Sequence, residues 1–247
     1  AAAVAFVAKA MSTTAKVVMP RSANPARVEK CRSYGAEIVF VADGMEAAKT
    51  VQEIADREER TFIHPYEGPL TTTGTGTLGL EIVEQINDLD AVVVAMGGGG
   101  LCSGVGAAIK QSLPDCEVFA VEPVGADTMF RSFQSGKPQS LDVVRTIADT
   151  LAPPLVLPYS FEICRRAIDD IVLVSDDEMR EAMAAAYRNL KLALEPGGAA
   201  AIAGMMGPLR ERLQGKRVCV IVCGSNIDFS GFLNHLQRSQ TERPAEE

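Results

Sequence analysis

Short apolar segments alternate with helical patterns along most of this 247-residue chain. A strand that is followed by a helix before the next strand returns as a parallel neighbour, because a crossover and not a hairpin joins the two. The expected strands are 16–20, 38–41, 61–64, 91–95, 118–121, 171–174 and 218–222. We therefore predict an α/β fold of open, mostly parallel sheets with helices on both faces.

The expected strands fall into two groups, before about residue 66 and after about residue 90. A turn-rich stretch, 65–76, lies between them and precedes a helix expected over 77–86. This spacing predicts two domains, a small one over 1–68 and a larger one over 69–247. The 47% share of apolar residues is enough for sizeable cores and excludes intrinsic disorder.

Two helix starts are marked by local sequence. Asn24-Pro25 supplies an N-cap and then a proline at the first helical position. Ser175 and Glu178 form the pattern of a capping box. Behind it a stripe at helical spacing is expected to be core: Met179, Met183, Ala186, Leu190 and Leu194.

Composition limits the partners and the location. The 24 Lys+Arg against 32 Asp+Glu give a charge of −8, which argues against nucleic-acid and anionic-membrane partners. No apolar run approaches the roughly 20 residues of a membrane span, and Lys9 interrupts the apolar opening, which has no basic region before it. The six cysteines show no metal-ligand spacing, so we expect reduced thiols in a cytoplasmic protein.

The strongest local signal is the run Gly97-Gly98-Gly99-Gly100-Leu101, which follows an expected strand and opens a helix. Glycines at this position let backbone N–H groups cradle an anion in front of the helix dipole. We interpret the run as a phosphate-binding loop. A flexible connector and a nicotinamide-binding Rossmann loop, with Glu122 on the ribose, remain alternatives.

Two further turns could carry chemistry. Cys223-Gly-Ser-Asn226 follows the last strand, at the sheet edge where open parallel sheets bind ligands. Glu195-Pro-Gly-Gly-Ala199 closes a long helical pattern, where a carboxylate is more often a cap than a catalyst. His64 and His235 fit no hydrolytic triad, and the pairs 169–170 and 176–177 are interpreted as solvated aspartates.

Taken in order, these turns resemble the fold-type II pyridoxal-phosphate enzymes of the serine/threonine dehydratase and serine racemase branch. The matching segments run from end to end of the chain. They are His64–Tyr66, Thr73–Thr77 with Glu81, Gly97–Leu101 with Ser103-Gly104, Val121–Pro123, Thr146–Asp149, Lys191–Pro196 and Cys223–Asp228.

The resemblance implies roles for several residues. Gly97, Gly98, Gly99, Gly100 and Leu101 would bind the phosphate of pyridoxal 5'-phosphate. Cys223 would face the pyridine nitrogen, with Glu195 nearby, and a neutral thiol there suits elimination of a β-hydroxyl.

Racemase-type relatives also hold a divalent cation. The resemblance would assign Mg²⁺ or Ca²⁺ to Glu122, the Ala126 carbonyl and Thr128. The family carries an acid at the position of Thr128, and a hydroxyl is a weaker ligand for these cations. This difference argues against metal binding.

The family's Schiff-base lysine and its substrate-carboxylate segment align before Ala1, and no lysine here matches that motif. We therefore expect an N-terminally truncated first domain and a chain that is inactive alone. The parent reaction implied is dehydration and deamination of L-threonine or L-serine to a 2-oxo acid and ammonia, by a homodimer. The alternatives are a non-catalytic or partner-dependent phosphate-binding scaffold, serine racemase and hydroxyaspartate dehydratase.

Overall fold

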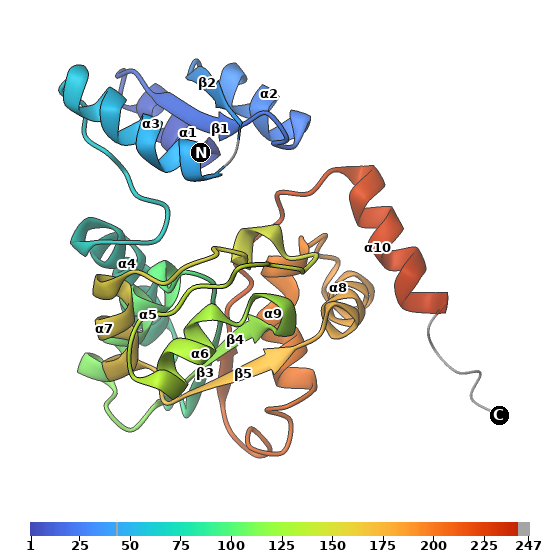
Figure 1. Cartoon of the computed structure of the whole chain (residues 1–247). Coiled ribbons are helices and arrows are strands. Elements are labelled where there is room, and N and C mark those ends of the chain that lie inside the picture. The colour runs from blue at the N-terminus through green and yellow to red at the C-terminus, as the bar shows by residue number, and fades with distance from the viewer. Residues whose placement is uncertain (43, 242–247) are drawn as a thin grey trace. The chain divides into compact units, whose positions relative to one another are not determined.

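The computed structural model describes residues 1–42 and 44–241, which form two compact units, Ala1–Ile63 and His64–Glu247 (Figure 1). Within the described residues, the first unit holds a two-stranded parallel sheet and the second a four-stranded parallel sheet. Parallel strands joined through helices confirm the predicted α/β fold. The domain limits 1–68 and 69–247 stay a prediction.

The first unit runs α1 (Ala2–Ala10), β1 (Lys16–Pro20), α2 (Pro25–Ser33), β2 (Glu37–Val41) and α3 (Gly44–Arg57). The strands pair in register from Lys16 opposite Glu37 to Pro20 opposite Val41. As predicted, the Asn24 side chain caps α2 and accepts a hydrogen bond from the Ala26 N–H (2.8 Å). The core is small and consists of Ala5, Val17, Met19, Val28, Cys31 and Ala36.

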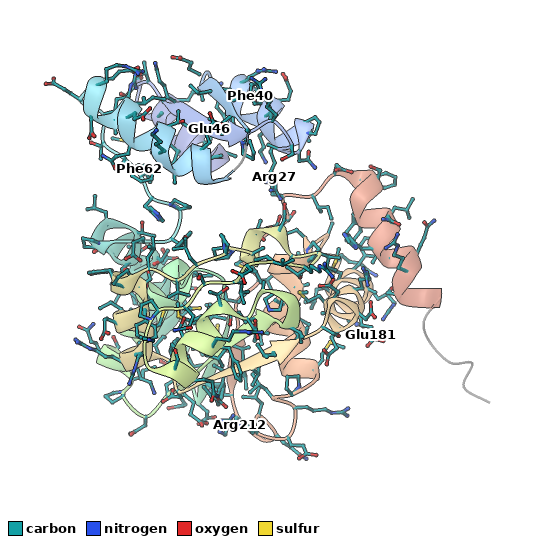
Figure 2. All side chains as sticks on the ribbon, in the orientation of Figure 1. Arg27, Phe40, Glu46, Phe62, Glu181 and Arg212 are labelled. Atoms are coloured by element: carbon teal, nitrogen blue, oxygen red, sulfur yellow. The ribbon has the colours of Figure 1, made fainter. Side chains whose placement is uncertain are left out.

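The strand expected at 61–64 is wrong. These residues adopt neither helix nor strand, and Phe62 (labelled in Figure 2) and Ile63 are 37% and 52% exposed. A strand needs a neighbouring strand as well as apolar residues. In the described part of this unit, pairing ends at β1 and β2, and residues 60–64 connect the two units.

The second unit contains the larger sheet, with strand order β5-β4-β3-β6. Its elements are α4 (Pro69–Gln85), β3 (Ala91–Ala95), α5 (Gly100–Ser112), β4 (Glu117–Pro123), η1 (Val124–Ala126), α6 (Thr128–Ser135), η2 (Asp149–Leu151), α7 (Pro158–Ala167), β5 (Asp170–Val174), α8 (Asp176–Leu190), α9 (Pro196–Met206), β6 (Val218–Val220) and α10 (Phe229–Thr241).

Side chains fill the space on both faces of this sheet (Figure 2). The odd-numbered residues of β3 pack in one core with α8 and α9. The even-numbered residues of β3 pack in the other core with α5 and α7. Burial on both faces explains why β3 is apolar throughout instead of alternating apolar with polar residues.

The turn expected over 65–76 is also wrong beyond residue 68, because α4 begins at Pro69. A Cβ on Gly79 would lie 2.7 Å from the Ala108 Cβ, and one on Gly104 would overlap the Thr75 hydroxyl. The glycines of α4 and α5 therefore allow close packing between these helices. The Thr75 hydroxyl donates to the Gly100 carbonyl (2.8 Å), so it ties α4 to the start of α5.

The capping box at Ser175 and Glu178 is confirmed at the start of α8. Met179, Met183 and Ala186 are buried as predicted, and so is Leu194, although it lies beyond α8. The predicted burial of Leu190 is wrong, because this residue is 57% exposed. The helix ends there because Lys191 takes a left-handed conformation (φ 59°), so the helical spacing stops.

Candidate functional site

The carboxyl ends of the parallel strands in the second unit carry the residues singled out from the sequence. The glycine run follows β3, Glu122 is the penultimate residue of β4, and Cys223 follows β6. Because these strands are parallel neighbours, their ends share one edge of the sheet.

Each glycine of the loop is held close to another part of the unit. A Cβ on Gly97 would lie 2.9 Å from the Leu151 Cα, and one on Gly100 would lie 2.6 Å from the Tyr66 Cα. A Cβ on Gly98 would overlap the Tyr66 ring, and Gly99 takes a left-handed conformation (φ +88°). The loop therefore excludes side chains, as the cradle interpretation requires, and it is not an unconstrained connector.

The loop ends at the N-terminus of α5. Gly99 is the N-cap residue and has no side chain to accept from the first N–H groups of the helix. Leu101 is partly buried and packs against the core beneath α5. A helix end of this kind, without a side-chain cap, attracts an anion through its N–H groups and its dipole.

A second wall of the site comes from η2, α9 and the turn after β6. A Cβ on Gly197 would overlap the Thr150 hydroxyl, while the next residue, Leu151, packs against Gly97. A Cβ on Gly198 would overlap the Gly224 carbonyl. The structure thus brings the glycine loop, the start of α9 and the turn after Cys223 together.

Cys223 and Glu195 lie in this second wall. Glu195 is buried, is the N-cap residue of α9, and its N–H donates to the Gly224 carbonyl (3.3 Å). The Cys223 thiol donates to the Gly197 carbonyl (3.8 Å). Although Cys223 is exposed as a residue, protein atoms around the sulfur raise the pKa of its thiol, and the Glu195 carboxylate raises it further. The thiol is therefore protonated near neutral pH.

Glu122 is fully buried, and both of its oxygens accept backbone hydrogen bonds at the start of α6, from Met129 (2.9 Å) and Phe130 (2.8 Å). Burial raises the pKa of its carboxyl to about 8, against the opposing effect of these two hydrogen bonds. Glu122 is therefore held by the start of α6 and not presented to a ribose hydroxyl, which weighs against the nicotinamide alternative.

The side chains implied for a cation already have protein partners. Both Glu122 oxygens are engaged by α6, and the Thr128 hydroxyl donates to the Pro153 carbonyl (3.2 Å). Ala126 is buried in η1. Among the described residues, no group of three or more His, Cys, Asp or Glu side chains could hold a metal ion.

Asp176 is a residue whose role was missed. It was expected to be solvated, but it accepts from the Thr146 hydroxyl (2.7 Å) and the Ile147 N–H (3.1 Å). It thereby anchors the segment that ends in η2 against the glycine loop. No local pattern marks this role, because the adjacent capping box already accounts for an acid at the start of α8.

The glycine loop lies between two walls at the carboxyl edge of an open parallel sheet. The class of protein is therefore an α/β protein with a candidate site for a phosphorylated small molecule. Comparison with known proteins identifies the family. A family model described as "Pyridoxal-phosphate dependent enzyme" matches residues 1–224. The chain therefore belongs to the pyridoxal-phosphate-dependent enzymes, in the fold-type II group of serine/threonine dehydratases and racemases.

Three relatives illustrate this similarity. Phenylserine dehydratase of Ralstonia pickettii is 49% identical over 233 residues, which are 94% of this chain and 72% of the relative. Catabolic L-threonine dehydratase of Escherichia coli is 39% identical over 217 residues, or 87% of this chain and 66% of the relative. The structure of maize serine racemase matches with a TM-score of 0.90 at 31% identity, over 98% of this chain and 74% of that one.

Within residues 1–42 and 44–241, no helix combines the length and the apolar character needed to cross a bilayer.

Proposed function

We propose that the chain belongs to an enzyme that eliminates water from a 3-hydroxy amino acid. The resulting imino acid then takes up water by hydrolysis, so the products are a 2-oxo acid and ammonia. The observation that carries the proposal is the glycine loop before α5, closed on one side by Tyr66 and on the other by Leu151. Pyridoxal phosphate supplies an electron-withdrawing ring that stabilises negative charge on the α carbon of an amino acid.

The residues of the chain would hold this cofactor at two points. Gly97–Leu101 offer backbone N–H groups and the positive end of the α5 dipole to the phosphate. Cys223 offers a protonated thiol to the ring nitrogen, beside the Glu195 carboxylate. A neutral partner does not enforce a charged ring, which favours loss of a β-hydroxyl over reactions that need a stronger electron sink.

The relatives support a proposal for the substrate class. L-Threonine and L-serine remain the predicted substrates, and L-threonine fits the relative from Escherichia coli. The 49% identity to phenylserine dehydratase adds 3-hydroxy amino acids with an aromatic β-substituent. We propose this wider class, with the β-hydroxyl as its common feature.

Whether the chain acts alone depends on a lysine for the cofactor. Lys191 is exposed at the end of α8, and its ammonium group donates to the Arg188 carbonyl (2.8 Å), which supports a structural role. Inactivity of the isolated chain therefore stays a prediction. A scaffold that binds the cofactor without turnover is the alternative function.

The test is to add pyridoxal phosphate and then L-threonine, L-serine or phenylserine to the purified chain, and to measure cofactor binding and 2-oxo acid. Binding with 2-oxo acid formation supports the lyase and ends the prediction of inactivity. Binding without turnover supports the scaffold, and absence of cofactor binding contradicts both. D-Serine formed from L-serine in the same reaction would instead support a racemase, as in the relative from maize.

Three smaller predictions accompany this function. The free state of all six cysteines supports a cytoplasmic location, which cell fractionation tests.

The homodimer implied by the resemblance is tested by sedimentation. The engaged Glu122 carboxylate supports metal independence, so addition of EDTA or Mg²⁺ is expected to leave cofactor affinity unchanged.

A further inference from the structure

One wall of the glycine loop is the segment that opens the second unit. The Tyr66 ring lies against Gly98 and the Tyr66 backbone lies against Gly100, close enough that neither glycine could carry a Cβ. The segment is folded on itself, because the His64 Nδ1 accepts from the Tyr66 N–H (3.2 Å) and the Glu67 N–H (2.9 Å). The position of Tyr66 therefore determines how much room remains next to Gly98 and Gly100.

The third glycine is covered by α6 and α7, and a Cβ on Gly99 would lie 2.8 Å from the Met129 Cε of α6. A Cβ on Gly99 would lie 3.1 Å from the Cys164 Sγ and 3.4 Å from the Ser160 Cβ. The Cys164 thiol donates to the Gly99 carbonyl (3.5 Å), and burial raises the pKa of this thiol, which keeps the proton in place. Residues 64–67 and α7, which lie far apart in sequence, thus both pack against the loop.

The Glu67 carboxylate joins these two segments. One oxygen accepts from the Tyr159 N–H (2.8 Å) and the other from the Ser160 N–H (3.0 Å), in the first turn of α7. The Ser160 hydroxyl completes the link by donating to the Tyr66 carbonyl (2.6 Å). Leu157, the N-cap residue of α7, makes no side-chain cap, so an acid from another segment caps this helix.

A charged group is favoured at this point for two reasons. A carboxylate accepts with both oxygens, and hydrogen bonds to a charged acceptor are stronger than neutral ones. The N-terminus of a ten-residue helix also stabilises negative charge. The amide of a glutamine has the same shape but would turn an N–H₂ group toward one of the two backbone N–H donors.

We propose that Glu67 is a positioning residue for the phosphate cradle, and that its carboxylate fixes Tyr66 and α7 around Gly98–Gly100. This proposal rests on the proposed function only for the identity of the ligand, since the clamp itself consists of contacts within the chain. Glu67 does not touch the loop, so its effect passes through Tyr66, Ser160 and Cys164.

The experiment compares Glu67→Gln with Glu162→Gln, which removes a charge from an exposed position on α7, the helix that Glu67 caps. Ser160→Ala is the second test variant, because it removes the hydroxyl link while keeping the Glu67 charge. Two properties are measured: amide hydrogen exchange of residues 97–101 without ligand, and the affinities for pyridoxal phosphate and for pyridoxal, which lacks the phosphate.

We expect faster exchange of residues 97–101 in Glu67→Gln and in Ser160→Ala, but not in Glu162→Gln. We also expect Glu67→Gln to lower the affinity for pyridoxal phosphate about tenfold, the size of one lost charge-assisted hydrogen bond, and to leave the affinity for pyridoxal unchanged. A change in overall stability alone would lower both affinities together, so the ratio separates positioning from general destabilisation.

Unchanged exchange in both test variants would overturn the proposal, and so would an equal loss of both affinities. If the unaltered chain binds no pyridoxal phosphate while the exchange of residues 97–101 responds as expected, the clamp is supported and the proposed function is contradicted. If Glu67→Gln does not fold, the same two measurements on Ser160→Ala decide the proposal.

Discussion

At the scale of single residues, the glycines of the candidate site differ in what they do. Gly98 and Gly100 make room for Tyr66, Gly97 makes room for Leu151, and Gly99 supplies a left-handed turn. The glycine run predicted a phosphate-binding loop, but the residues that pack against it come from segments far along the chain. Their identity could not be predicted, because no local pattern links position 66 or 151 to the loop.

Gly99→Ala tests the loop directly. The new Cβ would be strained by the positive φ and would lie 2.8 Å from the Met129 side chain. Gly215→Ala is the matched control, since Gly215 also has a positive φ (+79°) but nothing within 4 Å of a Cβ. Both variants carry the strain of a positive φ, but only the Cβ of Gly99→Ala would also displace the loop from the Met129 side chain. We therefore expect a loss of cofactor affinity of about tenfold or more in Gly99→Ala and none in Gly215→Ala. An equal loss in both variants, measured by equilibrium dialysis, would mean that backbone strain and not the cradle explains the effect.

A second residue-scale prediction concerns Glu58 in the first unit. Its carboxylate accepts hydrogen bonds from Lys16 (2.9 Å), Arg57 (3.0 Å) and Arg60 (2.9 Å), which lower its pKa to about 2, with Lys16 contributing most. Because the pKa of Glu58 is lower in the folded state, its carboxylate stabilises the fold fully at pH values above the unfolded-state pKa of 4.5. This contribution is lost as the pH falls toward 2.

We therefore expect Glu58→Gln to shrink the drop in the urea midpoint between pH 7 and pH 2.5. Glu59→Gln, at the exposed neighbouring position, is the control and should keep the full drop. If the two variants lose the same stability on acidification, the Glu58 cluster does not act as described.

At the scale of helices and strands, most of the fold could be predicted. The strands of the larger sheet are strongly apolar, and the starts of α2 and α8 carry local caps, so each of these signals is contained within a few residues. The start of α4 was missed because its glycines and threonines, which are typical of turns, are used for packing against α5. Helix packing of this kind depends on tertiary contacts that override local preference.

Two glycines of α4 predict opposite effects of the same substitution. Gly79→Ala would press a Cβ against Ala108 and should destabilise the second unit by about 1–3 kcal/mol. Gly74→Ala meets nothing within 4 Å and should stabilise the helix by about 0.5–1 kcal/mol, because alanine loses less backbone freedom on folding. Urea unfolding of both variants checks the signs, and stabilisation by Gly79→Ala would contradict close α4–α5 packing.

At the scale of the whole molecule, the chain consists of two units with cores of very different size. The first has one small core, whereas the second has separate cores on the two faces of its sheet. All the residues assigned here to the cofactor belong to the second unit. The family could be identified from the ordered set of turns, whereas the roles of Glu67 and Asp176 required the contacts between distant segments.

The connection between the units predicts a cleavage site. Residues 60–64 have no helix or strand, and Phe62 is exposed. We expect brief chymotrypsin treatment to cut after Phe62 before it cuts after Phe6 or Phe229, which are more exposed but lie in helices. Mass spectrometry of the fragments checks this, and earlier cleavage inside α1 or α10 would contradict the division between the units.

The central claim is that the loop before α5 binds the phosphate of pyridoxal phosphate. The most direct measurement is a crystal structure of the chain grown with this cofactor. We predict phosphate oxygens within hydrogen-bonding distance of backbone N–H groups in residues 97–101, and the ring nitrogen beside the Cys223 sulfur. A phosphate bound elsewhere, with Gly97–Leu101 making no contact to it, would contradict the claim.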